Sequence, residues 1–409
     1  MDLVLTRPQL VRWRTAIFAI FLAGGLSIAT WASRVPAIKQ TLDIDNIQVG
    51  TMLLIGGIAS IVGLSLSSVI LARFGARRGM LGAMFIFAAG LVVIGAGTDV
   101  VGSAPVVAVG LVLWGFGNGA VDVMMNVEGA AIETQSGKTI LPLFHAFFSG
   151  GTVLGAGLGV VFIAWGMNVV AHLCIVAVVI VVIAVVSIAA VPVRRESDDT
   201  PAAAEHTTWR ARLGVALSAW REPRTYALGV IMLGMSFAEG GANDWLALGV
   251  VEGHGAPQEL GALGLAVFSV SMTVVRVFGG PLVDRFGRVA VLRVLSVAAV
   301  AGLLLFILAP TTPLVFVGAA LWGVGASLGF PLGMSAAGDD PERAAARVSA
   351  AATIGYIAFL AGPPLLGLIS EQIGLLNTLY ILVALVAASG FASGAAKPLA
   401  GAQVGAGRH

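Results

Sequence analysis

The chain has 409 residues, of which 58% are hydrophobic and only 11% are charged, and its formal net charge is +2. Soluble globular chains carry about 25% charged residues, so this composition excludes a soluble enzyme and a disordered protein. The single cysteine, Cys174, excludes a disulfide within the chain, and no run of basic residues indicates a nucleic-acid surface. We therefore expect most of the chain to be surrounded by lipid.

Apolar runs long enough to cross a membrane recur along the whole sequence. A bilayer core of about 30 Å needs about 20 apolar residues per helix. Such runs cover residues 15–34, 49–71, 79–98, 106–130, 141–165, 168–191, 224–249, 259–281, 290–309, 314–336, 347–370 and 373–395. No small-residue cleavage site follows the first run, so we interpret it as a retained span rather than a signal peptide.

The longest polar stretch divides these twelve runs into six and six. We predict an all-α membrane protein with two six-helix bundles, at residues 1–192 and 223–409, joined by a cytoplasmic linker at residues 193–222. Of the 23 lysines and arginines, only Arg34 and Lys39 fall in segments that this arrangement places outside. Because basic residues stay on the cytoplasmic side, we expect both termini in the cytoplasm and the protein in the plasma (inner) membrane.

Three features of the first half recur in the second half at similar offsets. They are the Leu-Trp-Gly-x-Gly motif of Trp114 and Trp322 (offset 208), the Arg-Phe-Gly motif of Arg73 and Arg285 (offset 212), and the tryptophans Trp31 and Trp245 (offset 214). Similar offsets indicate duplication of a six-helix unit. Transporters use such repeats, with the binding site between them near the middle of the membrane.

The segment from Gly280 to Arg288, after the eighth span, reads Gly-Pro-Leu-Val-Asp-Arg-Phe-Gly-Arg. It resembles the G-x-L-x-D-R-x-G-R signature of the major facilitator superfamily, and this resemblance covers nearly the whole chain. The resemblance implies that Asp284, with Arg285 and Arg288, holds a cytoplasmic gate closed. In the first half Ala72 replaces the acid, so we expect no equal lock there. The alternative is that these charges only set the topology.

The fourth span is similar to the fucose-permease branch of this superfamily, which has an acidic residue followed by Asn one helical turn later. Here the pair is Asp122 and Asn126, although the acid is Asp, no Pro follows, and the first span has no acidic residue between Arg14 and Arg34. Asn118 extends the same helix face. We predict that this polar face binds solute or a proton, and the alternative is a hydrogen-bonded seam between helices.

Other ionisable residues inside the spans are also candidates, because a charge in lipid is costly unless it is neutralised or paired. They are Glu128, His145, His172, Glu239, Asp244 and Arg276. His145 is a candidate because imidazole titrates near neutral pH, and a structural role is its alternative. Trp31 and Trp245 can stack on a ring-shaped solute, whereas tryptophan at a membrane interface often has no such role.

Glu239 is the strongest candidate for solute binding or proton coupling. It lies in the seventh span, four residues before Asn243, and Gly240 and Gly241 between them can loosen the helix and free backbone groups for a ligand. A carboxyl group in an apolar span can take up and release a proton.

An outer gate is predicted at the ends of the first and seventh spans. Arg34 ends the first span and Asp244 lies in the outer part of the seventh. Because these spans are repeat equivalents, we expect Arg34 to pair with Asp244, or otherwise with Glu239, when the site faces inwards. The alternative is that Arg34 reaches lipid phosphate while Asp244 faces water.

The sequence therefore predicts a secondary active transporter that moves a small organic solute, sugar-like or related, by alternating access. Proton-coupled uptake is our first interpretation. The alternatives are proton-coupled efflux of a drug or metabolite, and a sensor of the same fold that does not transport. We find no nucleotide-binding loop and no catalytic or metal-binding motif, so we expect no enzyme activity and no cofactor. The expected partners are the solute, protons and the lipid bilayer, with no nucleic acid, and the protein is expected to be a monomer.

Overall fold

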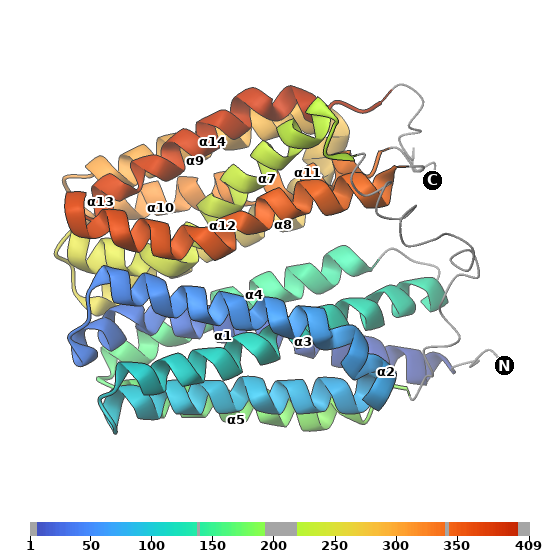
Figure 1. Ribbon diagram of the computed structural model, residues 1–409, viewed down its shortest axis with the longest axis horizontal. Coiled ribbons are helices and arrows are strands. Elements are labelled where there is room, and N and C mark those ends of the chain that lie inside the picture. The colour runs from blue at the N-terminus through green and yellow to red at the C-terminus, as the bar shows by residue number, and fades with distance from the viewer. Residues whose placement is uncertain (1–5, 137–139, 193–218, 340–342, 400–409) are drawn as a thin grey trace. The chain divides into compact units, whose positions relative to one another are not determined.

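The structure is a computed structural model of the chain, and it describes residues 6–136, 140–192, 219–339 and 343–399. Most of the predicted linker at residues 193–222 lies outside the described residues. All of the regular elements in the described ranges are helices (Figure 1).

The helices of the first half are long and follow one another closely. They are α1 (Arg7–Leu42), α2 (Asn46–Asp99), α3 (Ala104–Ser136), α4 (Leu141–Ala164) and α5 (Val169–Ile188). The second half is more interrupted. Its elements are α7 (Pro223–Gly241), the π-helical turns η3 (Ala242–Leu246) and η4 (Gly249–Gly253), α8 (Gln258–Phe286), α9 (Arg288–Leu308), α10 (Thr312–Ala326), α11 (Gly329–Ala337), α12 (Ala344–Ile373), α13 (Leu375–Thr378), α14 (Tyr380–Ala392) and the 3₁₀ turn η5 (Ser393–Ala396).

Many of these helices have the length and composition of membrane-spanning segments. Among the described residues, 10 helices are long and apolar enough to cross a bilayer. One of them, α2, has 54 residues and contains two predicted spans, while the seventh predicted span is divided between α7 and the two π-helical turns. The prediction of an all-helical membrane protein with about twelve helices is confirmed.

The chain forms two compact units that differ from the two predicted bundles. Unit 1 comprises Met1–Thr200, Asn243–Thr273 and Pro363–Leu375, and unit 2 comprises the rest of the chain. Two segments of the second half thus belong to unit 1, because they pack against its helices, as described below. The division into bundles at residues 192 and 223 stays a prediction.

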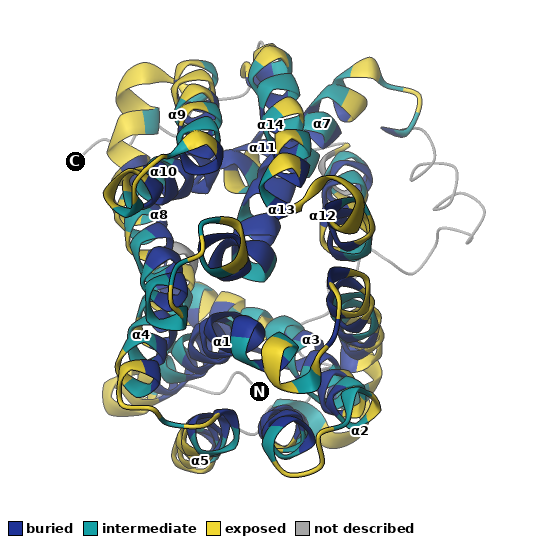
Figure 2. Cartoon of the chain, turned by 90° about the vertical axis from the view of Figure 1, so that its left-hand side faces the viewer, coloured by how far each residue is buried: buried dark blue, intermediate teal, exposed yellow. Residues whose placement is uncertain are grey.

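Unit 1 is built around α1, which is buried over most of its length (Figure 2). α1 packs tightly on α4 at several glycines. A methyl group on Gly151 would meet the backbone oxygen of Leu22, and one on Gly155 would meet that of Leu26. Across the same interface, a methyl group on Gly25 would meet the backbone oxygen of Phe148. Small residues therefore bring the two backbones together, as is typical of membrane helices.

The Arg-Phe-Gly motifs of the two halves have the same backbone conformation. Gly75 has φ 72° and ψ 164°, and Gly287 has φ 78° and ψ 156°. These values are strongly unfavourable for residues with a Cβ atom. Each glycine therefore sets the chain reversal between two spans, and the match supports the predicted duplication.

The tryptophans of the repeated Leu-Trp-Gly motif also make matching contacts. Trp114 Nε1 donates to Ser27 Oγ of α1 at 2.7 Å, and Trp322 Nε1 donates to the Ala238 carbonyl oxygen of α7 at 2.9 Å. In each half the fourth span is thus hydrogen-bonded to the first span of the same half. This second match further supports the duplication.

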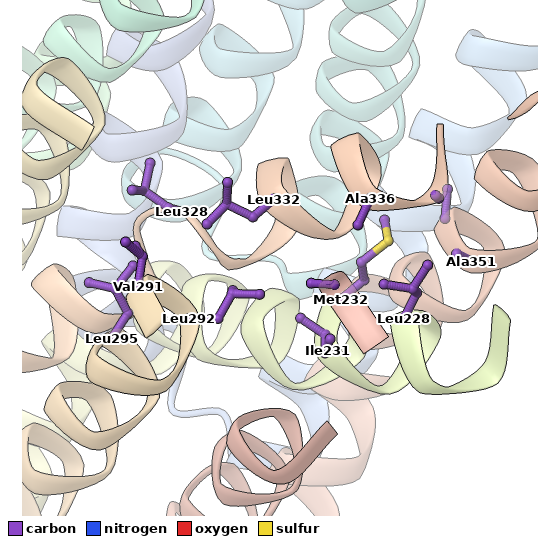
Figure 3. Close-up of a cluster of buried hydrophobic side chains, with 13 residues drawn as sticks. Leu228, Ile231, Met232, Val291, Leu292, Leu295, Leu328, Leu332, Ala336 and Ala351 are labelled. Atoms are coloured by element: carbon purple, nitrogen blue, oxygen red, sulfur yellow. The ribbon is translucent and has the colours of Figure 1, made fainter. Parts of the chain in front are cut away.

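The core of unit 2 holds the first half of α7 in place (Figure 3). Its buried side chains come from α7, α9, α11 with its N-cap, α12 and η5: Leu228, Ile231, Met232, Val291, Leu292, Leu295, Leu328, Leu332, Ala336, Ala337, Ala351, Ala352 and Ala396. Lipid tails are as apolar as these side chains, so close van der Waals packing is what holds such helices together in a membrane. Packing on several sides therefore fixes α7 up to the point where it breaks.

A charged cluster fastens the start of α7 to the start of α12. Glu222, the N-cap residue of α7, accepts hydrogen bonds from Arg347 Nε at 2.5 Å and from Arg343 Nη1 at 3.0 Å. The bond from Arg347 is the main reason why the pKa of Glu222 is lowered from its ordinary value of 4.5. The charged form of Glu222 is therefore stabilised by the fold.

The glycine contacts of α4 predict the effect of a single methyl group. Gly151→Ala places a Cβ against backbone and should destabilise the protein by about 1–3 kcal/mol. Gly150→Ala is the matched control, because a Cβ there meets nothing within 4 Å. Thermal unfolding of the detergent-purified protein measures both. Equal unfolding temperatures for the two variants would contradict the tight α1–α4 packing.

The lowered pKa of Glu222 predicts a pH dependence of stability. The ion pairs contribute fully above about pH 4.5, the value for an unpaired glutamate, and are lost as the pH falls through the lower folded pKa. Glu222→Gln should therefore unfold at a lower temperature than the wild type at neutral pH, and this difference should shrink below about pH 4.5. A difference that is constant over the whole pH range would show that the carboxylate charge is not the cause.

Candidate functional site

The seventh span is interrupted directly after the strongest candidate residue. α7 ends at Gly241, and the chain continues as η3 with i→i+5 hydrogen bonds. Single π-helical turns inside helices are frequently found at functional sites. The Gly240–Gly241 pair, which we expected to loosen the helix, lies at this transition. Glu239 is therefore the last charged residue before the break.

Glu239 forms an ion pair with Arg276 of α8. Arg276 Nη2 lies 2.7 Å from Glu239 Oε2, and the two side chains are 19% and 18% exposed. Arg276 Nε also donates to the carbonyl oxygen of Ser327 at 3.0 Å. Ser327 lies between α10 and α11, where the tenth span is broken. One guanidinium group thus joins α8 to the interrupted seventh and tenth spans of unit 2.

Sequence reasoning found both charges but did not pair them. The available signal was a carboxylate and a guanidinium in consecutive spans, each of which is costly to bury alone. The missing information was the register between α7 and α8.

Within the described residues, no group of three or more His, Cys, Asp or Glu could hold a metal ion.

The polar residues predicted on the fourth span lie on α3. Asn126 Nδ2 donates to the backbone oxygen of Asp122 at 2.8 Å and approaches Asp122 Oδ1 at 3.5 Å. Asn118, Asp122 and Asn126 are all half-buried. These residues belong to unit 1, whereas Glu239 and Arg276 belong to unit 2.

The two tryptophans predicted to stack on a solute are buried. Trp31 is 4% exposed and Trp245 is 0% exposed. Trp31 packs against Trp114 with ring centroids 6.5 Å apart. In this structure neither ring offers a free face, so both contribute to packing.

The structure places Arg34 in a different environment from the predicted outer gate. Arg34 is 3% exposed, and its Nε donates to Nδ1 of the fully buried His172 at 2.8 Å. Neither predicted partner pairs with Arg34. Glu239 pairs with Arg276 instead, and Asp244, which the structure describes, forms no ion pair with Arg34. The reason is that α5 offers Arg34 a buried acceptor. An Nδ1 atom that accepts this bond belongs to a neutral imidazole.

A different set of contacts joins second-half segments to the first half within unit 1. Lys39 of α1 pairs with Glu252 of η4, with Nζ 2.6 Å from Oε1, and Gln258 of α8 donates to Gln40 at 2.7 Å. At the start of α2, the backbone N–H of Asn46 donates to Glu371 Oε1 of α12 at 2.6 Å. These contacts lie at the end of unit 1 that contains the α1–α2 turn, which the sequence predicts to face outwards.

These outer residues were not predicted as site residues. Lys39 carried a signal, since it is one of the two basic residues in segments assigned to the outside, and Glu252 is an acid at the outer end of the seventh predicted span. Glu371 carried no signal, because its partner is a backbone group at a helix N-terminus. Such a group favours an acidic side chain.

Of the residues predicted to form the cytoplasmic gate, Arg288 pairs with an acid other than Asp284. Asp284 and Arg285 are exposed, whereas Arg288 Nη1 pairs with Asp339 Oδ1 at 2.6 Å. Asp339, which follows α11, also pairs with Arg224 of α7 at 3.0 Å. Asp339 therefore links the starts of α7 and α9, and sequence reasoning missed it because its partners are distant in the chain.

Two further candidates lie apart from the Glu239–Arg276 pair. His145 is exposed on α4 and contacts the Phe21 ring edge-on, with ring centroids 5.3 Å apart. Asn243 is half-buried in η3. The predicted common face of Glu239 and Asn243 assumed a regular α-helix, and the π-helical turn changes that register.

Comparisons with known proteins agree with this architecture. The Major Facilitator Superfamily matches residues 16–363 of the chain. "Uncharacterized transporter y4wD" of Sinorhizobium fredii is 29% identical over 383 residues, which cover 93% of this chain and 97% of the relative. "Uncharacterized MFS-type transporter YPO1221/y2967" of Yersinia pestis is 30% identical over 387 residues, or 93% and 94% of the two chains.

Solved structures show the same fold at low sequence identity. A variant of the nucleoside transporter NupG has a TM-score of 0.75 and 16% identity, with 95% of this chain and 100% of that chain covered. The fucose:proton symporter FucP of E. coli has a TM-score of 0.63 and 15% identity, with 96% and 100% covered. The chain is therefore a multi-pass membrane protein that belongs to the major facilitator superfamily, a family of transporters rather than enzymes.

Proposed function

We propose that this transporter takes up a small organic solute together with protons, by alternating access across the bacterial cytoplasmic membrane. Its termini lie in the cytoplasm, and a monomer is the working unit. The observation that carries the proposal is the Glu239–Arg276 ion pair, 2.7 Å long, at the break in α7. The similarity of the fourth span to fucose permeases favours a sugar-like solute.

The ion pair provides a way to couple a proton to a change of conformation. Arg276 pairs with Glu239 and at the same time donates a hydrogen bond to the carbonyl oxygen of Ser327. A proton on Glu239 removes one charge of this ion pair, and breaking a buried ion pair from one side is destabilising. Protonation of Glu239 therefore loosens the junction of α7, α8 and the tenth span.

The Asp122–Asn126 pair serves as the second polar position for solute or proton. Asn126 already bonds to the backbone of Asp122, so its amide fixes the orientation of this part of α3. Asp122 forms no ion pair with any residue that the structure describes. It lies in an apolar span, where a carboxyl group is most stable when it is protonated or bound to a ligand.

The contacts of Lys39, Gln40 and Asn46 with second-half segments form the outer gate in this proposal. They replace the Arg34–Asp244 pair expected from the sequence. On the cytoplasmic side, Asp284 keeps its proposed role as a lock between the two halves. The ion pair of Asp339 with Arg288 instead joins α9 to the end of α11 within unit 2.

Substitution of the central carboxyl tests the coupling. Glu239→Gln should abolish accumulation driven by a pH gradient in proteoliposomes but leave counterflow exchange measurable, because exchange needs no net proton movement. Asp122→Asn should have the same effect or weaken solute binding. A panel of radiolabelled sugars, nucleosides and organic acids identifies the solute, and the sign of the driving gradient distinguishes uptake from efflux.

A matched control accompanies this experiment. Glu259→Gln removes a carboxylate from the first turn of α8, far from Arg276, and should accumulate solute like the wild type. If Glu239→Gln and Asp122→Asn both accumulate solute as the wild type does, the coupling assignment is wrong. If neither uptake nor exchange occurs with any solute of the panel, the sensor interpretation gains support.

Charge reversal tests the proposed outer gate. Lys39→Glu and Glu252→Lys should each increase the fraction of molecules whose outer end is open. The double variant should return this fraction to the wild-type value. A partly exposed pair contributes about 1 kcal/mol or less, so each shift should be less than about tenfold. Spin-label distances between positions 101 and 256, in a Cys174→Ser background, measure the fraction. A double variant that resembles the single variants would exclude the pair as a gate.

A further inference from the structure

We infer that Tyr356 and Phe359 of α12 form an aromatic platform on which a ring of the solute stacks. This inference rests on the proposed transport of a small organic solute and specifies one structural feature of that solute. The sequence candidates for stacking, Trp31 and Trp245, are both buried. Tyr356 and Phe359 are instead 50% and 40% exposed, and their ring centroids are 6.5 Å apart.

The platform lies next to the break in the seventh span. A Cβ atom on Gly240 would lie 3.1 Å from Cδ1 of Phe359, so this ring lies against the α7 backbone directly after Glu239. In return, a Cβ atom on Gly362 of α12 would lie 3.2 Å from Cε1 of Phe237. Two glycines therefore bring α7 and α12 together at this level, and each of them faces a phenylalanine ring of the other helix.

A third aromatic residue extends the platform towards the break in the tenth span. Phe330 of α11 lies three residues after Ser327, whose carbonyl oxygen accepts a hydrogen bond from Arg276. The ring centroids of Phe330 and Tyr356 are 5.8 Å apart, and a Cβ atom on Gly355 would lie 3.2 Å from Cε2 of Phe330. The aromatic rings thus connect the two broken spans, and Arg276 binds groups at the same two breaks.

Phe359 faces away from the lipid side of α12. Ile357, Ala361 and Leu368 are exposed apolar residues at spacings of four and seven, so they share one face of the helix, as expected for lipid contact. With 3.6 residues per turn, Phe359 lies about 160° around the helix from Ile357 and from Ala361. It is therefore on the side that contacts α7, where its exposed surface is available to a solute rather than to lipid tails.

Exposed aromatic rings near a charged pair suit a solute with a flat ring and polar substituents. Binding sites for small molecules combine aromatic walls with a few polar groups that fix the orientation of the ligand. A cyclic sugar offers a face of C–H groups to an aromatic ring, and a nucleoside offers the π-face of its base. The shared chemistry is a ring with a flat apolar face and hydroxyl groups around it. An open-chain polyol has similar hydroxyl groups but no fixed face that can stack.

Matched ring and open-chain compounds test this inference. The sugar pool contains D-glucose, D-galactose and D-mannose, the polyol pool contains sorbitol, galactitol and mannitol, and the nucleoside pool contains adenosine and uridine. A ligand that binds the folded state raises its unfolding temperature. At least one ring pool should stabilise the full-length purified protein, and the polyol pool should have little effect. The pool that stabilises the protein shows which kind of ring the platform takes.

Variants of the two rings separate stacking from packing. Tyr356→Leu and Phe359→Leu keep an apolar side chain but remove the flat ring, so each should weaken binding of the stabilising pool about 5- to 100-fold, the loss expected for one stacked ring. Tyr356→Phe and Phe359→Tyr keep a ring and should retain most of the affinity. Phe391→Leu removes a ring that is 90% exposed near the end of α14, and this control should bind like the wild type. Unfolding temperatures without ligand verify that each variant is folded.

The outcomes distinguish this inference from the proposed function. Ring binding that needs Tyr356 and Phe359, without proton-driven accumulation in proteoliposomes, supports the inference and contradicts the proposed transport. Accumulation of the polyols at the same rate as the sugars contradicts the inference and leaves transport in place. Equal stabilisation by the sugar and polyol pools, no stabilisation by either ring pool, or unchanged ring binding in both leucine variants also overturns the inference.

Discussion

The neutralisation of charge inside the membrane is the constraint on which this structure depends. A carboxylate or a guanidinium group alone in lipid is strongly unfavourable, and the protein combines Glu239 and Arg276 into one pair. The pair lies where the seventh span changes from α7 to η3 and where the tenth span is broken at Ser327. Irregular backbone at membrane depth persists only where it is buried in protein or lines an aqueous cavity. The charge pair therefore links the two broken spans at this junction.

Close helix packing provides the rigid surroundings in which such a junction can work. Gly151 and Gly155 bring α4 against the backbone of α1, and Gly329 lies against the side chain of Met235 on α7. In both halves a tryptophan of the fourth span is hydrogen-bonded to the first span of that half. The helices on either side of the breaks are thus fixed by packing.

The sequence predicted the features that depend on composition, periodicity and local spacing. These include about twelve helices and the common helix face of Asp122 and Asn126. It did not predict features that depend on the register between helices. Arg34 faces His172, Arg288 pairs with Asp339, and Glu371 reaches a backbone group of α2. Charge and spacing show which residues need partners, but only the packed helices show which partner lies opposite.

The central claim is that Glu239 takes up the transported proton and thereby releases Arg276. Infrared difference spectroscopy of the reconstituted protein, between high and low pH, detects this proton directly through the carbonyl band of a protonated carboxylic acid. The account predicts a band in the wild type that disappears in Glu239→Gln and shifts in Arg276→Lys, since the altered partner changes the proton affinity of the carboxyl group. A band of unchanged position and intensity in Glu239→Gln would show that another group carries the proton, and would contradict the account.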